Sequence, residues 1–323
     1  MKLCITGGTG SLGQALLAHF LPDPEVTRLV VLSRDEVKQD ALSNRFVDLR
    51  LNWFLGDVRD RERCQMAFHG CDTVVHAAAL KRITRGANDP WEFTKTNVLG
   101  TINVILAALA AKVERVLFIS SDKAVEATNL YGKTKALAED FAVQSNSYTY
   151  PQALRVSVLR YGNVMASRGS VLEVWQGQAA EGGPLTLTDT RMTRFLVSLP
   201  QAARWVHATL DRMEGGEIFV PRLPSARIVD LAGLLHPTVP IKYTGIRSGG
   251  EKLHEILISQ EEKTRTMTML DPFRYVILPS HHSWRTAPWA YYPIVGDVPS
   301  FSSAGHLLRL GALYDWLHRE SLI

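Results

Sequence analysis

The sequence has few cysteines, no long apolar run and little excess charge, and each of these absences excludes a class of protein. Its 323 residues include three cysteines, Cys4, Cys64 and Cys71, which are odd in number and lack the spacing of metal ligands. We therefore expect packed free thiols in a reduced compartment, without a disulfide framework or a metal site. No apolar run approaches the ~20 residues of a membrane span, and strand and turn chemistry begins at Lys2 rather than a signal peptide. These features predict a cytoplasmic protein without a membrane span.

The charge balance argues against a nucleic-acid partner. The chain carries 36 lysines and arginines against 32 aspartates and glutamates, which leaves a net charge of +4. This small excess suits an anionic small ligand better than a nucleic acid. The length is sufficient for one large or two modest domains with a substantial core.

The first half of the chain alternates short apolar runs with stretches of helical periodicity. After the first run, Leu12, Leu16 and Phe20 recur at helical spacing before Pro22 ends the helix. Such alternation with short connections is typical of βαβ units, so the sequence predicts an α/β fold with a doubly wound parallel sheet of the Rossmann type. The six predicted strands are Leu3–Thr6, Leu29–Leu32, Trp53–Leu55, Thr73–His76, Val116–Ile119 and Val156–Leu159.

This rhythm breaks after about Tyr161, where glycines and prolines separate shorter elements. We assign residues 1–165 to a cofactor-binding Rossmann domain, with a contribution from about residues 193–220. Residues 166–323 are assigned mainly to a smaller substrate-binding domain over the carboxyl edge of the sheet. The leucines and tryptophan between residues 307 and 317 predict a closing amphipathic helix.

A glycine motif at residues 8–13 follows the first strand directly and opens a helix, which is typical of a dinucleotide-binding turn. Its glycines allow close approach of a pyrophosphate to the helix N-terminus. The second strand ends at Ser33-Arg34-Asp35, where an NAD enzyme would place the carboxylate first. A hydroxyl and a guanidinium there favour the 2′-phosphate of NADP over NAD. The predicted cofactor-binding residues are Gly7, Thr9, Gly10, Ser11, Leu12, Gly13, Ser33, Arg34, Asp57, Val58, Ala77, Ala78, Ala79, Tyr131 and Lys135.

The stretch from Ser120 to Lys135 contains a set of acid–base groups beside the end of the fifth predicted strand. A hydroxyl, a carboxyl and an amine stand in a row at Ser121, Asp122 and Lys123, and Tyr131 precedes Lys135 by one helical turn. Chemistry in an open parallel sheet lies just outside the carboxyl ends of the strands. These five side chains are therefore the predicted catalytic residues.

Motifs along nearly the whole chain resemble the extended short-chain dehydrogenase/reductase superfamily. Within it, SSDKA followed by YGKTK resembles the inverting UDP-N-acetylglucosamine 4,6-dehydratases of polysaccharide biosynthesis and flagellin glycosylation, in their short soluble form. The resemblance implies a tightly bound NADP that is recycled in each turnover, a UDP-sugar substrate and a homo-oligomer. The motifs are SRDEVKQ (33–39), GDVRD (56–60), HAAALK (76–81), KTN (95–97), SSDKAVEATNLYG (120–132), RYGNVMASRGSV (160–171), RMTRF (191–195) and GEKLHE (250–255).

The resemblance also implies a role for each catalytic residue. Tyr131, its pKa lowered by Lys135 and the cofactor's charge, takes the proton of the C4 hydroxyl as hydride leaves C4, and Ser121 holds that oxygen. Asp122 as acid and Lys123 as base then eliminate water across C5 and C6, hydride returns to C6, and reprotonation inverts C5. These roles require the pKa of Lys123 to fall and that of Asp122 to rise through burial.

Five further residues are predicted to bind the substrate. Guanidinium groups match phosphate oxygens, and Arg191 is a further candidate for such a contact. The loop from Arg247 departs from the family pattern, since it lacks a proline and is one residue longer. The predicted substrate-binding residues are Lys81, Asn163, Arg194, Arg247 and Glu251.

Two alternatives share the glycine motif with this prediction. A UDP-sugar C4 epimerase or a non-inverting dehydratase would use the same Tyr131 and Lys135, and its turnover would largely survive Asp122→Asn or Lys123→Ala. A non-catalytic NADP-sensing protein on this fold would generally lose the tyrosine–lysine pair, which this chain keeps.

Overall fold

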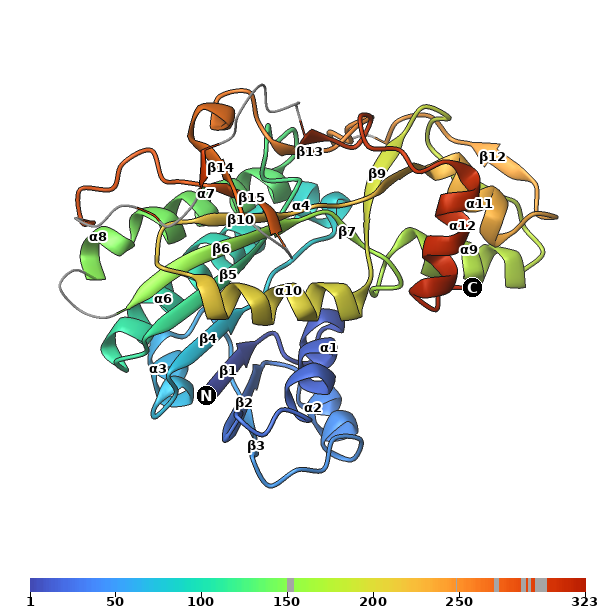
Figure 1. Cartoon of the computed structure of the whole chain (residues 1–323). Coiled ribbons are helices and arrows are strands. Elements are labelled where there is room, and N and C mark those ends of the chain that lie inside the picture. Colours follow the sequence, from blue (N-terminus) through green and yellow to red (C-terminus); the bar gives the residue numbers. More distant parts are fainter. Residues whose placement is uncertain (150–153, 248, 270–272, 286–288, 290–291, 294–300) are drawn as a thin grey trace.

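A large open sheet organises the protein, which is described here from a computed structural model (Figure 1). The parallel part of the sheet has the order β10-β6-β5-β4-β1-β2-β3, and β15, β14 and β16 extend it by antiparallel pairing beyond β10. The structure describes residues 1–149, 154–247, 249–269, 273–285, 289, 292–293 and 301–323. The strands of this sheet are β1 Lys2–Thr6, β2 Arg28–Ser33, β3 Leu51–Leu55, β4 Thr73–His76, β5 Arg115–Ser121, β6 Arg155–Tyr161, β10 Ile218–Pro221, β14 Thr266–Thr268, β15 Phe273–Ile277 and β16 Tyr292–Pro293.

The predicted α/β fold is confirmed, and the six predicted strands correspond to β1–β6. Strands β1, β2, β4, β5 and β6 form because their apolar runs are buried on both faces of the sheet, as parallel strands covered by helices require. Strand β3 lies at the edge of the sheet and is only partly buried. Strand β4 has the predicted bounds, whereas β5 and β6 extend further at both ends. The carboxyl ends of β1, β4, β5 and β6 lie along one edge of the sheet, because these strands are parallel neighbours.

Helices cover both faces of the sheet (Figure 1). On one face α1 packs against α10, and on the other α6 lies between α3 and α7. The helices of this lobe are α1 Ser11–Phe20, α2 Glu36–Ser43, α3 Arg61–Phe68, α4 Ile83–Asn88, α5 Pro90–Phe93, α6 Gly100–Ala110, α7 Leu130–Gln144, α8 Asn146–Thr149 and α10 Leu199–Arg212, with a π-helical turn (η1) at Thr94–Leu99 and a 3₁₀ turn (η2) at Glu262–Arg265.

A smaller lobe lies beyond the carboxyl edge of the sheet, at the right of Figure 1. It has its own apolar core, in which Trp175 and Trp316 are buried among leucines and methionines. The closing helix begins at Leu310, three residues later than the predicted stretch. The elements beyond the large sheet are β7 Asn163–Val164, β8 Leu185–Leu187, β9 Thr193–Val197, β11 Ser225–Arg227, β12 Ile241–Tyr243, β13 Ile256–Ile258, β17 Phe301–Ser302, α9 Val171–Ala180, α11 Ile228–Leu235 and α12 Leu310–Arg319.

The division of the chain between the lobes is more interleaved than a single boundary suggests. Residues 199–221 contribute α10 and β10 to the large lobe, and residues 266–277 contribute β14 and β15 from the part that we assigned mainly to the smaller domain. All three cysteines are free and buried in the core of the large lobe, as predicted.

One helical segment is long and apolar enough to span a membrane by length and composition. It runs from Pro90 to Ala110 through α5, η1 and α6, and 56% of its most apolar window is buried inside the protein. The prediction that no segment approaches this length was therefore too strong. Its buried face packs against α3 and α7, which is the environment of a core helix.

Candidate active site

The turn between β1 and α1 has the close backbone packing that its glycines were predicted to permit. Gly7 has a φ of +69°, and a Cβ on it would lie 2.8 Å from the Cα of Ala78. A Cβ on Gly13 would lie 2.3 Å from the carbonyl oxygen of Gly8, so larger residues are excluded at both positions. Gly10 is the N-cap of α1 and supplies no side-chain cap. The first-turn N–H groups of α1 are therefore suited to an anionic group such as a pyrophosphate.

The end of β2 carries the cation Arg34 beside Asp35, whose carboxylate is engaged as a helix cap. Asp35 is the N-cap of α2, because its side chain accepts from the backbone N–H of Lys38 at 3.0 Å and from the Lys38 ammonium. Arg34 is half exposed and lies 3.6 Å from Asp57. Ser33 accepts a 3.2 Å hydrogen bond from Gln39. The carboxylate that could accept ribose hydroxyls is thus engaged, while the guanidinium of Arg34 faces solvent.

Arg168 reaches the glycine turn from the segment after β7, a contact that the sequence analysis missed. Its backbone N–H donates to the Ser11 hydroxyl at 3.0 Å, and its guanidinium donates to the Thr9 carbonyl. The neighbouring Ser167 accepts a 3.2 Å hydrogen bond from Lys81. The SRGSV motif was noted for its resemblance, but nothing local in it indicated that the segment lies against the cofactor turn.

A buried polar network fixes the segment that follows β4. Thr101 donates to the Asn97 carbonyl at 2.7 Å, so His76 Nε2 is the donor in its 3.0 Å bond to Thr101. His76 Nδ1 must then accept the 2.7 Å hydrogen bond from Thr6 at the end of β1. Burial, followed by the charge of Lys135, lowers the pKa of His76 to about 3, which keeps the ring neutral. The network links the ends of β1 and β4 behind Ala77, Ala78 and Ala79.

The same network continues through Asn97 to α7, which carries Tyr131 and Lys135. Its side chain accepts from the backbone N–H of Leu80 at 2.8 Å and donates to the Leu80 carbonyl at 2.9 Å. It also donates to Thr134 at 3.0 Å, and Thr134 donates to the Tyr131 carbonyl at 2.8 Å. The predicted cofactor segment and the start of α7 are therefore held at a defined separation.

The stretch from Ser121 to Lys135 forms a tight turn followed by α7. Asn129 is the N-cap of α7 and accepts from the Gly132 N–H at 2.9 Å. A Cβ on Gly132 would lie 2.2 Å from the Lys123 carbonyl oxygen, so the turn can pack against the helix only because that residue is glycine. This packing places Asp122 and Lys123 near Tyr131.

Asp122 and Lys123 form an ion pair at the end of β5, in which Lys123 is partly exposed. Lys123 Nζ lies 2.8 Å from Asp122 Oδ1, 3.2 Å from Asn163 Oδ1 and 3.5 Å from Glu255 Oε1. Asp122 is fully buried, and its Oδ2 has no hydrogen-bond partner among the described residues. Ser121 donates to Asp122 Oδ1 at 2.9 Å. The three protons of the Lys123 ammonium thus face three oxygen acceptors.

The charges of this cluster set the two pKa values in different ways. Burial raises the pKa of Asp122, as expected, although the ammonium of Lys123 opposes the rise. Burial works to lower the pKa of Lys123, but the carboxylates of Asp122 and Glu255 outweigh it and raise that pKa well above its usual value. The expectation of a lowered Lys123 pKa is therefore wrong for the protein alone, because sequence did not reveal the second carboxylate.

Tyr131 and Lys135 are both buried and lie on α7. Burial raises the pKa of Tyr131, and the charge of Lys123 and a hydrogen bond with Ser121 only partly oppose it. The predicted lowering by Lys135 is not found. The Lys135 ammonium instead donates to the Ile119 carbonyl at 2.6 Å and lies 3.9 Å from the centre of the Phe118 ring. Burial lowers the pKa of Lys135 to about 7.

The predicted substrate residues lie at three different positions. Lys81 and Asn163 contact Ser167 and Lys123, as described above, and burial and then Arg168 lower the pKa of Lys81. Arg247 is exposed and lies 3.9 Å from Glu251, and Glu251 lies 3.4 Å from Arg194.

The two arginines of the RMTRF motif have different surroundings. Arg194 is buried, and its guanidinium also donates to the carbonyls of Thr193, Lys252 and Leu253. Arg191 is exposed and pairs with Asp189 at 2.8 Å. Arg194 therefore organises the 251–255 loop, whereas Arg191 forms a local surface pair.

The loop that departs from the family pattern packs on the turn between β5 and α7. The Gly250 carbonyl accepts from Thr128 at 2.5 Å and from Asn129 at 3.1 Å, and Lys252 donates to the Val125 carbonyl. A Cβ on Gly250 would lie 2.4 Å from the Thr128 carbonyl oxygen. The loop therefore buttresses the start of α7.

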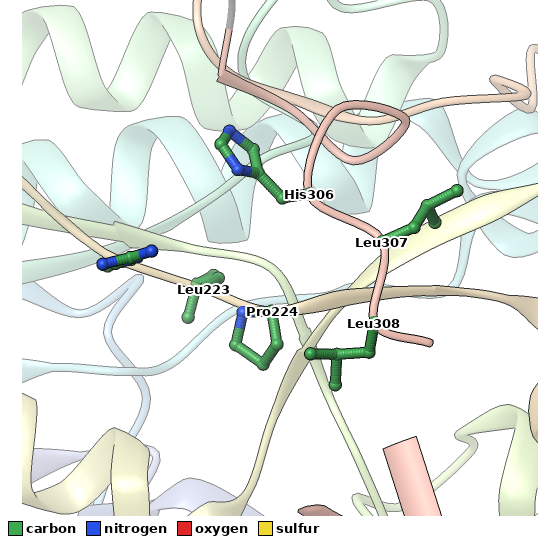
Figure 2. Close-up of a pocket in the computed structure, with 6 residues that line it drawn as sticks. Leu223, Pro224, His306, Leu307 and Leu308 are labelled. Carbon is green, nitrogen blue, oxygen red and sulfur yellow. The ribbon is translucent and has the colours of Figure 1, made fainter. Parts of the chain in front are cut away.

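Glu255, like Arg168, contacts predicted site residues in a way that the sequence analysis missed. It is the last residue of the quoted GEKLHE motif, in which only Glu251 was given a role, and it is buried beside Lys123 and Arg194. A pocket of about 380 Å³ lies elsewhere, between the chain after β10 and the segment before α12 (Figure 2). Its lining, Arg222, Leu223, Pro224, His306, Leu307 and Leu308, contains no predicted site residue.

The family described as "Polysaccharide biosynthesis protein" matches residues 3–276. A Campylobacter jejuni protein named UDP-N-acetylglucosamine 4,6-dehydratase (inverting) is 42% identical over 266 residues, 82% of this chain and 79% of that protein. A Rickettsia massiliae protein named UDP-glucose 4-epimerase is 40% identical over 279 residues, 84% of this chain and 82% of that protein. The X-ray structure of Pen from Bacillus thuringiensis has a TM-score of 0.91, at 29% identity over 100% of this chain and 98% of Pen.

Proposed function

Because the chain belongs to the polysaccharide biosynthesis protein family, we propose that it is an NADP-dependent 4,6-dehydratase of UDP-N-acetylglucosamine that inverts C5. The product would be a UDP-2-acetamido-2,6-dideoxy-hexos-4-ulose. The observation that carries the proposal is the pairing of Lys123 with the buried Asp122 beside Tyr131, because an elimination needs an acid and a base at adjacent carbons.

Several residues suit the cofactor of this reaction. The uncapped N-terminus of α1 suits the pyrophosphate, and Arg34 suits a 2′-phosphate because Asp35 is engaged as a helix cap. Ala77, Ala78 and Ala79 would line the site. NADP bound there would supply a hydride acceptor for C4 and the hydride that is later returned to C6.

Tyr131 and Ser121 would handle the C4 oxygen. Tyr131 takes the hydroxyl proton as the 4-ketone forms, while Ser121 holds the oxygen by a hydrogen bond. The positive charge of Lys123 favours the phenolate that this step requires. The 4-ketone then acidifies the proton on C5.

Asp122 and Lys123 would perform the elimination after one proton moves between them. Transfer of a proton from Lys123 Nζ to Asp122 over 2.8 Å converts the ion pair into a neutral amine and a carboxylic acid. The amine takes the C5 proton, and the acid protonates the departing C6 hydroxyl, so the pair ends as ammonium and carboxylate. C5 then takes one proton from solvent on the opposite face, which gives inversion, and Tyr131 returns the C4 hydroxyl proton to solvent, so that protons balance over the turnover.

A UDP-sugar C4 epimerase is the second candidate, and the Rickettsia relatives favour it. An epimerase needs the cofactor and Tyr131 but no acid–base pair for elimination. Incubation with UDP-N-acetylglucosamine and NADP+ distinguishes the two by mass spectrometry, since a dehydratase product has lost one water and an epimerase product has the mass of its substrate. Retention of the substrate mass would overturn the dehydratase assignment for this sugar.

The configuration at C5 is tested separately. The reaction is run in D2O, and the ring coupling constants of the deuterated product are read by NMR. Coupling constants of the inverted sugar are expected, and those of the retained sugar would overturn the inversion. We also propose a cytoplasmic location and a homo-oligomer, which fractionation and the mass measured by light scattering would test.

A further inference from the structure

Glu255 lies against the catalytic lysine from a distant part of the chain. It immediately precedes β13, and its backbone is held by Ser303, which accepts from the Glu255 N–H at 2.9 Å and donates its own backbone N–H to the Glu255 carbonyl at 2.8 Å. Its side chain is 4% exposed, and Oε1 lies 3.5 Å from Lys123 Nζ. Oε2 is buried without a hydrogen-bond partner among the described residues. A buried carboxylate with a spare oxygen is costly unless charge or function compensates for it.

The charged and titratable groups around Lys123 come from several elements. Asp122 lies on the same turn, and Glu255 approaches from the loop before β13. Arg194 on β9 lies 3.8 Å from Glu255 and partly neutralises it. The groups that act electrostatically on Lys123 or are acted on by it are Asp122, Glu255, Arg194, Tyr131, Lys252 and Lys81.

Glu255 bears directly on the proton transfer that the proposed mechanism needs. Its negative charge stabilises the ammonium form of Lys123, which is the form that cannot accept the C5 proton. Moving that proton to Asp122 places the neutral amine beside Glu255, where its charge is no longer compensated by Lys123. Groups coupled this closely titrate as one unit, so the charge of Glu255 affects both Asp122 and Lys123.

We propose that Glu255 is a positioning residue that sets the distribution of the proton between Asp122 and Lys123. It holds Lys123 as an ammonium in the substrate-free protein, and it acts on the substrate only through that lysine. This inference rests on the proposed dehydratase function. A merely structural Glu255 would hold the 251–255 loop through its backbone and would leave the titration of Lys123 unchanged.

The test is the pH dependence of kcat for water loss in Glu255→Gln. Removal of a negative charge 3.5 Å from Lys123 makes the protonated forms of both Lys123 and Asp122 less stable. Both limbs of the bell-shaped profile are therefore expected to move to lower pH, by about one to three pH units. Glu255→Asp keeps the negative charge but moves it away from Lys123, because the side chain is one methylene shorter. The pH profile of this variant is therefore expected to shift in the same direction as that of Glu255→Gln, but by less. Glu126→Gln removes an exposed carboxylate from the same turn and is expected to leave the profile in place.

A second measurement needs no turnover. Acetylation of Lys123 by acetic anhydride, followed by peptide mass spectrometry across pH, reports the neutral amine directly. The Glu255→Gln profile is expected to shift by the same amount as the kinetic one, in protein whose melting curve shows that it is folded. An unshifted labelling profile in whichever Glu255 variant folds overturns the inference. If the wild-type protein does not remove water from UDP-N-acetylglucosamine, the proposed function is overturned. The labelling profile still tests whether Glu255 controls the protonation of Lys123, because labelling needs no turnover.

Discussion

Lys135→Met is expected to stabilise the cofactor-free protein at neutral pH while it removes the proposed catalysis. Burial lowers the pKa of Lys135 from 10.5 to about 7, with Glu139 acting weakly in the other direction. Between those two pH values the unfolded chain therefore binds one more proton than the folded protein, and stability rises with pH. Below pH 7 both states carry the proton, and the full cost of burying the charge remains.

The magnitude follows from the difference between the two pKa values, about 3.5 pH units. At about 1.4 kcal/mol for each unit, burial of the ammonium costs about 5 kcal/mol at low pH. Methionine removes this cost, but it also loses the hydrogen bond to the Ile119 carbonyl and the contact with the Phe118 ring. Those two contacts contribute about 2–4 kcal/mol together. Lys135→Met should therefore gain about 1–3 kcal/mol near pH 6, lose that advantage near pH 8–9 and be less stable than the wild-type protein by about 1–3 kcal/mol near pH 10.

Urea unfolding of both proteins across pH 6–10, after removal of bound nucleotide, measures the difference in the free energy of unfolding. Taking the difference cancels the titration of other groups, including the buried cysteines, whose pKa values burial also raises. A difference that is constant over this range would refute the reasoning, because it would mean that Lys135 binds its proton equally in both states. A methionine variant that is less stable at every pH would refute it as well.

Three further predictions concern catalysis and cofactor binding. Asp122→Asn should lower water loss from UDP-N-acetylglucosamine by about 10²–10⁴-fold, while the absorbance of reduced nicotinamide still appears; unchanged water loss would favour the epimerase. Arg168→Gln should release bound cofactor at least about tenfold faster in gel filtration, since it removes a side-chain contact to the glycine turn. Arg227 is exposed and pairs with Asp230, so Arg227→Gln is the control and should leave the release rate unchanged. Arg34→Ala should weaken NADP more than NAD in fluorescence titrations, and equal weakening of both would argue against a 2′-phosphate contact.

The sheet could be predicted from the sequence because its signals are local. The apolar run Thr73–His76 is buried on both faces and has the predicted bounds. The glycine turn was equally readable, since a Cβ at Gly7 or Gly13 would collide with backbone. The antiparallel strands β14 and β15 were not predicted, because the pairing of β15 with β10 depends on a partner about 55 residues earlier in the chain.

The residue types of the site could be predicted from the sequence, but the charged neighbours that set their pKa values could not. Asp122, Lys123 and Tyr131 lie together because one strand, one turn and one helix carry them. The approach of Glu255 to Lys123 and of Arg168 to Ser11 depends on how the second half of the chain folds over the first. A pKa is set by such neighbours, so the sequence led to the wrong direction for Lys123.

The ion pair in the structure corresponds to the state that the proposed elimination leaves behind. Water loss ends with Lys123 as an ammonium and Asp122 as a carboxylate, and these charges suit the 2.8 Å contact in which Lys123 Nζ donates to Asp122 Oδ1. The next turnover must therefore begin with the reverse proton transfer, against two carboxylates that stabilise the ammonium. Burial of Asp122 opposes them, because it raises the pKa of that carboxyl and favours its neutral form. The balance between burial of Asp122 and the charge of Glu255 thus determines how often the pair is ready to react, and these two features should be changed separately to measure it.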